Sequence, residues 1–504
     1  MSVTDYKTFS SKIREKLLED LSDHKIIQLW FERIITIQYL VAYDIFSFDN
    51  DYTSKNIIKL CEKENSYFPS LFPDNIEVLR NNYPSCFYTK EIVELLEKNI
   101  NKNTSVEEII NFQEDFKDHE RYINFTSTSR NSDTLVTKDN ITSVTQIFTP
   151  KWIAKLMCEN TLNNHNFETV SILDPCLGTG HLLVVMFDEL FKKYKKNTNY
   201  NNFSIIKKIY QKQLFGFDID EIVIRLAKFI FLIKAINVCP DINVSTIPLP
   251  NFVHIRSFDI DKDSQYYNLS KKFEKASLVG SLIKVSDSCK VLKDLTTEEE
   301  ALVKVVNLLN KKYDIVITNP PYMGRKVLPK DLLEFLNNNF SLGKSELYTS
   351  FIERCLAFLN EDGSLAMLTL HTFMFIKSFE ELRKYIIMNY QIDQLLHLGK
   401  NTFENLNAYN ALACMFIIRN KKPFDKTLFI NLTSYDDNRL KKDAYKKGKD
   451  RYILSQYDFL EIEGAPLIYW LSKKEIDILT KSLKLGQFAK INLSLVFSAT
   501  SVCL

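Results

Sequence analysis

The sequence predicts an α/β protein built on an open, mostly parallel sheet with helices on both faces. Residues 140–420 alternate short apolar runs with amphipathic segments, which is typical of strands joined by helices. Residues 171–183 have the pattern of a strand, a tight glycine turn and a helix. Residues 214–218 form a second short apolar run that ends in an acid. In a doubly wound sheet, such a turn and such an acid lie at the carboxyl edge, where ligands bind.

The chain is long enough for more than one core, and we expect three regions. It has 504 residues, of which 45% are hydrophobic. Residues 1–139 are predicted to be helical, because apolar residues such as Ile35 and Tyr39 recur at helical spacing. Residues 140–420 form the α/β domain. Residues 421–504 are interpreted as the start of a truncated target-recognition or C-terminal region.

Charge and composition exclude few classes of partner. The 65 basic and 63 acidic residues give a net charge of +2, so phosphate contacts would have to be concentrated on one face. The nine cysteines contain no C-x-x-C pair and are interpreted as reduced thiols in the cytoplasm. No histidine pair has helical metal-ligand spacing, which argues against a metal site. The strongest apolar run, residues 222–236, is interrupted by charges and does not predict a membrane span.

The glycine turn after the first strand is a candidate ligand site. Gly178 and Gly180 would let the backbone approach a ligand, and the following helix would present its N-terminal amides there. Asp174 is placed to meet a cationic amine. Asp218, at the end of the second strand, is the candidate for gripping ribose hydroxyls, whereas Asp220 is expected to cap the next helix. The alternative interpretation is an ordinary strand-to-helix turn.

The segment Asn319-Pro320-Pro321-Tyr322 follows an apolar run and predicts chemistry on an amino group. An aromatic amine is a poor nucleophile, so an enzyme must hold both of its N–H groups. The Asn319 side-chain carbonyl and the Pro320 main-chain carbonyl can accept them, because paired prolines hold the backbone extended. Tyr322 can stack on the ring, which offsets roughly 1–3 kcal/mol of the cost of unstacking a base. A turn or a polyproline ligand is the alternative interpretation.

These segments resemble the ordered signature of DNA adenine-N6 methyltransferases of the gamma arrangement, in which the donor site precedes the catalytic site. The resemblance lies in residues 148–154, 174–180 and 319–322. It implies a Rossmann-like class I S-adenosylmethionine-dependent methyltransferase sheet over residues 140–420. The residues that it implicates in donor binding are Thr149, Asp174, Gly178, Gly180 and Asp218. Those that it implicates in catalysis are Asn319, Pro320, Pro321, Tyr322 and Phe403, the last as a second aromatic against the flipped base. An ordinary core position is the alternative interpretation of Phe403, because most aromatic side chains are packing residues.

A narrower resemblance extends over most of the chain. Residues 30–33, 149–153, 180–183, 280–284 and 319–324 are similar to the PglX-type adenine-specific methyltransferases of BREX phage-defence systems. This similarity implies methyl transfer from S-adenosylmethionine to adenine N6 in double-stranded DNA, with the adenine flipped out. It also implies a cytoplasmic location and other BREX components as candidate partners. Members of this family are longer and continue into a large target-recognition region.

Other functions remain open at this point. The chain could be the methylase of a restriction-modification system, an amino-group methyltransferase for protein or RNA, or a non-catalytic, partner-dependent remnant. A fused nuclease is not favoured, because Pro73-Asp74 is followed by residues 77–79 without the required lysine. Residues 255–259 are the candidate contact for the donor's adenine ring. The basic run at residues 439–449 could follow a phosphate backbone, although a solvated polar loop is the more frequent explanation.

Overall fold

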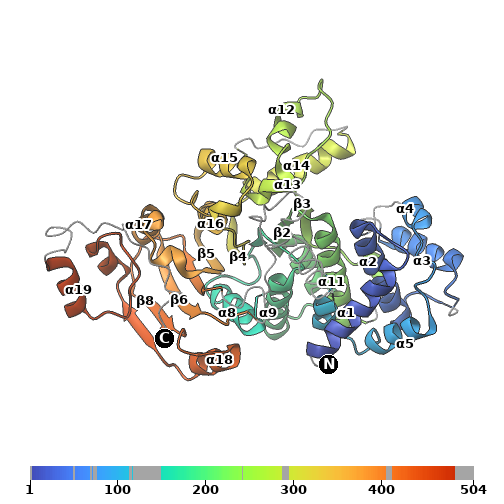
Figure 1. The fold of residues 1–504 in the computed structure, drawn as a ribbon, viewed down its shortest axis with the longest axis horizontal. Helices are drawn as coiled ribbons and strands as arrows, with labels where there is room; N and C mark the ends of the chain where they lie inside the picture. Colours follow the sequence, from blue (N-terminus) through green and yellow to red (C-terminus); the bar gives the residue numbers. More distant parts are fainter. Residues whose placement is uncertain are drawn as a thin grey trace, which may run out of the picture.

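A single mixed sheet crosses the molecule, with a helical N-terminal region at one end (Figure 1). The computed structural model describes residues 3–48, 51–68, 71, 76–112, 116, 149–240, 242–285, 295–403 and 411–482. Within them, nine strands follow the order β3-β2-β1-β4-β5-β7-β6-β8-β9. In chain order they are β1 (Ile172–Asp174), β2 (Leu214–Asp218), β3 (Asn251–His254), β4 (Tyr313–Thr318), β5 (Leu359–Leu370), β6 (Gln391–Gly399), β7 (Ala413–Arg419), β8 (Thr427–Asn431) and β9 (Arg451–Leu454).

Strand directions confirm the predicted α/β class. The strands β1 to β5 are mutually parallel, and β7 lies antiparallel between β5 and β6. Beyond β6, β8 pairs in parallel and β9 antiparallel, so the sheet continues past residue 420. The proposed division of the chain at residues 139 and 420 stays a prediction, but the sheet is not interrupted at residue 420.

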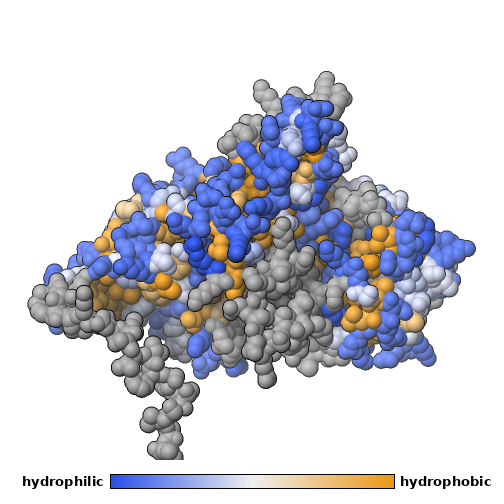
Figure 2. All heavy atoms as spheres, turned by 45° about the horizontal axis from the view of Figure 1, so that its top comes forward, coloured by the Kyte–Doolittle hydropathy of each residue, from blue (hydrophilic) through white to orange (hydrophobic). Residues whose placement is uncertain are grey.

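Helices cover both faces of the sheet. The helices that follow the N-terminal region are α8 (Lys151–Leu162), α9 (His181–Asn197), α10 (Asn202–Lys208), α11 (Glu221–Val238), α12 (Tyr267–Ser270), α13 (Ala276–Val279), α14 (Thr297–Asn310), α15 (Lys330–Asn339), α16 (Leu347–Ala357), α17 (Glu380–Asn389), α18 (Asn438–Lys446) and α19 (Lys473–Lys481). Helices α8, α9 and α11 pack in one core, and α14, α16 and α17 in the other. Figure 2 shows that the lobe around α12 to α15 presents mostly hydrophilic side chains on the face in view.

The central strands are apolar on both faces, as parallel strands between two helical layers require. Ile315 and Ile317 of β4 enter one core, and Val316 between them enters the other. All three side chains are 0% exposed. The alternation follows from the two-residue period of a strand. Strand β4 is therefore held firmly from both sides just before the segment that begins at Asn319.

The N-terminal region is helical, as predicted, within the described residues. Its helices include α1 (Val3–Leu18), α2 (His24–Ala42), α3 (Ser54–Tyr67), α4 (Ile76–Asn81) and α5 (Lys90–Asn99). Helix α2 contacts α11 through the Arg225–Glu32 ion pair at 3.3 Å. The Tyr39 hydroxyl also donates to Asn237 Oδ1 at 3.2 Å. The region shares one continuous hydrophobic core with α8, α9, α11 and the face of the sheet that these helices cover.

Two features discussed from the sequence, Pro73-Asp74 and Phe148, lie outside the described residues. Asp220 caps α11 as predicted, because its side chain accepts hydrogen bonds from the Ile222 and Val223 amides. Among the residues that the structure describes, no helix has the length and apolar character needed to cross a membrane.

A tight turn at Gly343 anchors the start of α16. The Gly343 carbonyl accepts hydrogen bonds from Thr349 Oγ1 at 2.6 Å and Ser350 Oγ at 2.9 Å. The Gly343 amide donates to Glu353 Oε2 at 2.8 Å. A Cβ added at residue 343 would lie only 2.6 Å from the Thr349 carbonyl carbon, so only glycine fits. These hydrogen bonds therefore fix the position at which α16 starts.

We expect Gly343→Ala to lower the free energy of unfolding by about 1–3 kcal/mol, because the added methyl group overlaps backbone that cannot move freely. Urea denaturation followed by circular dichroism measures the change. Gly324→Ala is the matched control, since a Cβ there meets no atom within 4 Å. Equal stability of the two variants would contradict this account of the turn.

Candidate active site

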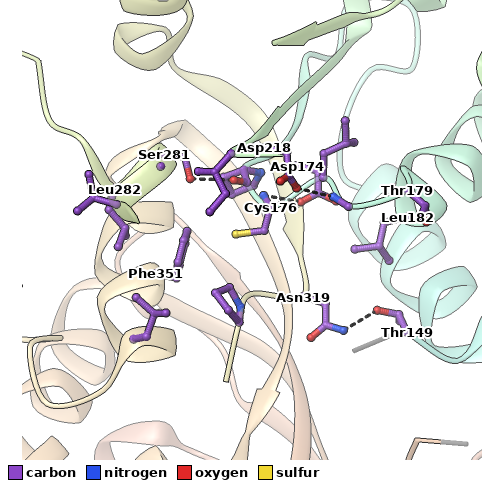
Figure 3. A pocket seen from close by; sticks show the side chains of 18 of the residues that line it. Thr149, Asp174, Cys176, Thr179, Leu182, Asp218, Ser281, Leu282, Asn319 and Phe351 are labelled. Carbon is purple, nitrogen blue, oxygen red and sulfur yellow. Dashed lines mark hydrogen bonds between the residues drawn. The ribbon is translucent and has the colours of Figure 1, made fainter. Parts of the chain in front are cut away.

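An open cavity lies at the carboxyl edge of the sheet (Figure 3). Its empty space is about 1020 Å³, solvent at the opening included. That volume is sufficient for a ligand of nucleoside size. The walls come from the segment before α8, the β1–α9 turn, the end of β2, residues 278–282, the loop after β4, and α16. The topology therefore brings together segments separated by up to 200 residues.

The β1–α9 turn forms one wall through two left-handed glycines. Gly178 has φ +53° and Gly180 has φ +81°, conformations that L side chains rarely adopt. A Cβ at Gly178 would meet no atom within 4 Å, so the backbone there faces open space. The Leu177 amide donates to the Phe217 carbonyl at 2.9 Å, which joins the turn to β2. A ligand can thus approach the Gly178 backbone closely.

Asp218 links the end of β2 to the same turn. Its Oδ2 accepts from the Gly178 amide at 2.9 Å, and its Oδ1 accepts from the Asp220 amide at 3.0 Å. Each carboxylate oxygen has a further acceptor site, and Asp218 also lines the cavity. The side chain is therefore fixed by the fold and still faces the space that a ligand would occupy.

Asp174, at the end of β1, is a buried carboxyl group in the floor of the cavity. Its side chain is 1% exposed, and Oδ1 accepts from the Cys176 amide at 3.0 Å. Burial raises the pKa of Asp174 to about 7, because the charged form loses its hydration. A cation beside the carboxyl group would restore the ionised form.

The segment after β4 carries a fixed asparagine side chain. Asn319 Nδ2 donates to Thr149 Oγ1 at 3.1 Å, and the Tyr322 hydroxyl donates to Asn319 Oδ1 at 2.5 Å. The same hydroxyl lies 3.1 Å from the Leu368 carbonyl of β5. Burial raises the pKa of Tyr322, so the hydroxyl keeps its proton and remains a donor. The amide of Asn319 is therefore oriented from both ends.

Phe403 lies beside Tyr322 and belongs to the hydrophobic core, which agrees with the alternative of a packing residue, while its role in base stacking stays a prediction. The two ring centroids are 6.1 Å apart and the planes are tilted by 54°. Phe403 is 2% exposed and Tyr322 is half-buried. A base stacked between two parallel rings needs about 7 Å, twice the usual carbon–carbon contact distance. These rings would have to separate slightly and turn before a base could enter.

The structure brings most of the predicted site residues together, while their roles remain predictions. Those that line the cavity are Thr149, Asp174, Gly178, Asp218, Asn319 and Pro321. Gly180, Pro320, Tyr322 and Phe403 are not among the lining residues. Gly180 completes the turn before α9, Pro320 is buried, and the rings of Tyr322 and Phe403 lie against each other.

One wall was not foreseen from the residues themselves. Residues 278–282 line the cavity, whereas none of residues 255–259 does. Arg256 instead pairs with Glu298 at 2.6 Å. Figure 3 shows Ser281 and Leu282 across the cavity from Thr149. The only signal in the sequence was the similarity of residues 280–284 to the family, which does not say where they fold.

Hydrogen bonds and packing hold this wall in place. Ser281 Oγ donates to the Pro175 carbonyl at 2.7 Å, beside the glycine turn. The buried Arg354 donates to the Ser281 carbonyl at 3.0 Å and to the Ile283 carbonyl at 2.8 Å. Gly280 has φ +52°, and a Cβ there would lie 2.7 Å from Ile219 Cγ2. The segment between β3 and β4 therefore returns to complete the cavity.

No group of three or more histidine, cysteine, aspartate or glutamate residues within the described ranges could hold a metal ion. The polar groups around the cavity are carboxylates, hydroxyls, the Asn319 amide, the Cys176 thiol, the His181 imidazole and main-chain amides. This set suits an organic ligand with hydroxyl and amine groups.

Two family models match the chain. Residues 212–403 match the Eco57I restriction-modification methylase family, and residues 136–269 match the N-6 DNA methylase family. The first match contains the Asn319 segment and the second contains the glycine turn.

Curated relatives agree with these matches. The adenine-specific methyltransferase PglX of Lacticaseibacillus casei (strain Zhang) is 27% identical over 68% of this chain and 35% of its own length. The adenine-specific methyltransferase BrxX of Escherichia coli O9:H4 (strain HS) is 24% identical over 70% of this chain and 37% of its own. The chain thus spans about a third of the length of these relatives.

Solved structures share the fold at low sequence identity. The methyltransferase subunit of the type I restriction-modification system from Streptococcus thermophilus aligns with a TM-score of 0.51 at 14% identity, over 93% of this chain and 99% of that one. The ATP-dependent type ISP restriction-modification enzyme LlaBIII aligns with a TM-score of 0.50 at 12% identity, over 90% and 32%.

These similarities confirm the predicted class I sheet and the cofactor that this fold implies, S-adenosylmethionine. The glycine turn, the family models and the related sequences all indicate the same kind of protein. The chain is similar to adenine-specific methyltransferases and to restriction-modification DNA methylases.

Proposed function

We propose that this chain transfers a methyl group from S-adenosylmethionine to N6 of a flipped adenine in double-stranded DNA. The observation that carries the proposal is the position of Asn319, oriented by Thr149 and Tyr322 at the edge of the cavity that the glycine turn lines. An acceptor for an amine therefore lies next to a site suited to the methyl donor.

The residues of the cavity fit the donor. The open space at Gly178 lets the donor lie close to the main chain. Asp218 can accept hydrogen bonds from the donor's ribose hydroxyls. The buried Asp174 favours the donor's ammonium group, and Thr149 would contact the methionine moiety. Bound there, S-adenosylmethionine supplies a methyl group on a positively charged sulfur. The apolar wall of residues 278–282 and Phe351 is suited to the flat adenine ring.

The acceptor side is formed by the segment after β4. The Asn319 side-chain carbonyl and the Pro320 main-chain carbonyl would accept the two N–H groups of the target amine. Pro321 fixes the path of the backbone, and Tyr322 and Phe403 would stack on the base. The Tyr322 hydroxyl already donates to Asn319 Oδ1, and a carbonyl oxygen has two lone pairs. Asn319 can therefore keep its orientation while it accepts from the substrate.

The chemical contribution of these residues is orientation and charge stabilisation. The two carbonyl groups align the nitrogen lone pair and stabilise the positive charge that develops on nitrogen. No general base is required in this step, because the proton leaves the methylated amine after transfer. Water is excluded by the aromatic pair, which is largely buried.

The biological setting is part of the proposal. PglX-like and BrxX-like sequences are the longer relatives, and we place the chain in a BREX-type phage-defence system, acting on DNA in the cytoplasm. Other BREX components would be its partners. A methyl-transfer assay with tritiated donor, using unmethylated plasmid DNA, RNA and protein as separate substrates, tests the substrate class. Incorporation of the label into RNA or protein, but not into DNA, would overturn the proposed substrate class.

Asn319→Ala is expected to lower kcat for DNA methylation by at least about 100-fold, because it removes an acceptor that acts in the transition state. Donor affinity, measured by calorimetric titration, should change by less than about threefold. Thr149→Val is the control for the lost Thr149 contact and should retain more activity. Equal loss of donor binding and transfer in Asn319→Ala would contradict the assigned role.

Donor affinity should depend on pH through Asp174. Below about pH 7 the raised pKa leaves Asp174 protonated, so binding an ammonium group must release a proton. Affinity for S-adenosylhomocysteine should therefore fall by up to about tenfold for each pH unit below 7, and level off above it. Calorimetry between about pH 5.5 and 8.5 measures this. Asp174→Asn should bind more weakly and lose the dependence; an unchanged profile would exclude Asp174.

Gly280→Ala should weaken donor binding by about tenfold or more, because the left-handed conformation becomes strained and the new methyl group displaces Ile219 beside Asp218. Gly464→Ala is matched for strain, with φ +81°, and lies outside the cavity. Calorimetric titration compares the two. Similar donor affinity in both variants would show that the wall of residues 278–282 does not contribute.

A further inference from the structure

A stripe of basic side chains runs along α18. The structure forms a helix here, where a polar loop was the more frequent expectation, and Asp437 caps it through the Leu440 amide at 2.7 Å. Arg439, Lys442 and Lys446 are exposed and recur at i, i+3 and i+7, so they share one face. The stripe covers about 10 Å at the rise of an α-helix.

These cations have no acidic partner within the described residues. No ion pair joins Arg439, Lys442 or Lys446 to a carboxylate, whereas some other surface cations are paired, as Lys151 is with Glu107. Asp443 lies on the same exposed side and reduces the local charge. Lys447 and Lys449 follow directly and are also exposed. The charge of the stripe is therefore available to an anion.

The opposite face of α18 holds the segment that leads into Phe403. Lys441 is 0% exposed, and its Nζ donates to the Lys400 carbonyl at 2.7 Å. Asn438 Nδ2 donates to the Thr402 carbonyl at 2.5 Å. The basic stripe is thus fixed to the residue that precedes the predicted base-stacking ring.

The same face also contacts the start of α8, and Figure 1 shows α18 close to α8. Trp152 Nε1 donates to Asn438 Oδ1 at 3.4 Å. The Trp152 ring lies 6.2 Å from the Tyr445 ring. Trp152 comes three residues after Thr149, the partner of Asn319. Helix α18 therefore joins the two segments that flank the Asn319 amide.

We infer that the exposed stripe of α18 binds the phosphate backbone of duplex DNA beside the flipped adenine. The inference rests on the proposed function. A flipped base remains attached to its own phosphates, so the DNA backbone must pass close to Phe403. Helix α18 is hydrogen-bonded to the segment just before Phe403. Three cations over about 10 Å match about three phosphates of one strand. The contact positions the DNA and carries no base sequence.

The test is the salt dependence of DNA binding by the triple variant R439Q/K442Q/K446Q of the full chain. Fluorescence anisotropy with a mixed-sequence duplex suffices, because phosphate contacts do not depend on sequence. We expect at least about tenfold weaker binding near 0.1 M salt, and a slope of log affinity against log salt reduced by about 2–3. The KM for DNA should rise while kcat and the affinity for S-adenosylhomocysteine change by less than about twofold.

The matched control is K55Q/K59Q/K98Q, which removes three exposed lysines from α3 and α5. It should leave the slope unchanged. An equal loss in both triple variants, or no loss in the α18 variant while the wild type methylates DNA, overturns the inference and leaves the proposed function standing. A wild-type chain that binds the donor but neither binds nor methylates DNA overturns both. If the triple variant is unstable, Lys442→Gln alone should lower the slope by about 1.

Discussion

The Asn319 amide is the point on which the arrangement of this site depends. Its nitrogen is bonded to Thr149 and its oxygen to Tyr322, whose hydroxyl also lies at hydrogen-bond distance from β5. These hydrogen bonds fix the relative positions of the segment before α8, the segment after β4 and strand β5. Strand β4 can support this because it is buried on both faces up to Thr318. If the end of β4 were flexible, Asn319, Thr149 and Tyr322 would not be held in a fixed arrangement.

The sequence predicted the parts of the site that depend on local chemistry. The turn at Gly178 and Gly180, the cap at Asp220 and the segment after β4 each require residue types that are visible in a short window. The α/β alternation followed from periodicity alone. The wall at residues 278–282 was not predictable in this way, because it depends on Gly280 meeting Ile219, sixty residues earlier. Such contacts are encoded in the packing of the whole domain.

The location of a basic surface was the second feature that the sequence did not predict. A net charge of +2 gave no indication of where anions bind, because it does not show how the charges are distributed over the surface. What distinguishes residues 439–446 is that three exposed cations share one face of a helix that is hydrogen-bonded to the segment before Phe403, and this arrangement becomes visible only in the structure. The helix also places Lys441 inward, so one short basic run serves both packing and an exposed surface.

The continuation of the sheet beyond residue 420 affects how the protein can be divided. Strand β8 pairs with β6, and β9 closes the outer side of β8. A fragment ending near residue 420 would leave the backbone groups of β6 unpaired along an apolar strand, which is a template for aggregation. Removal of α18 would also release the Lys400 and Thr402 carbonyls. The smallest excisable unit therefore extends past Leu454 to at least Tyr469, whose buried ring stacks on Phe429 of β8.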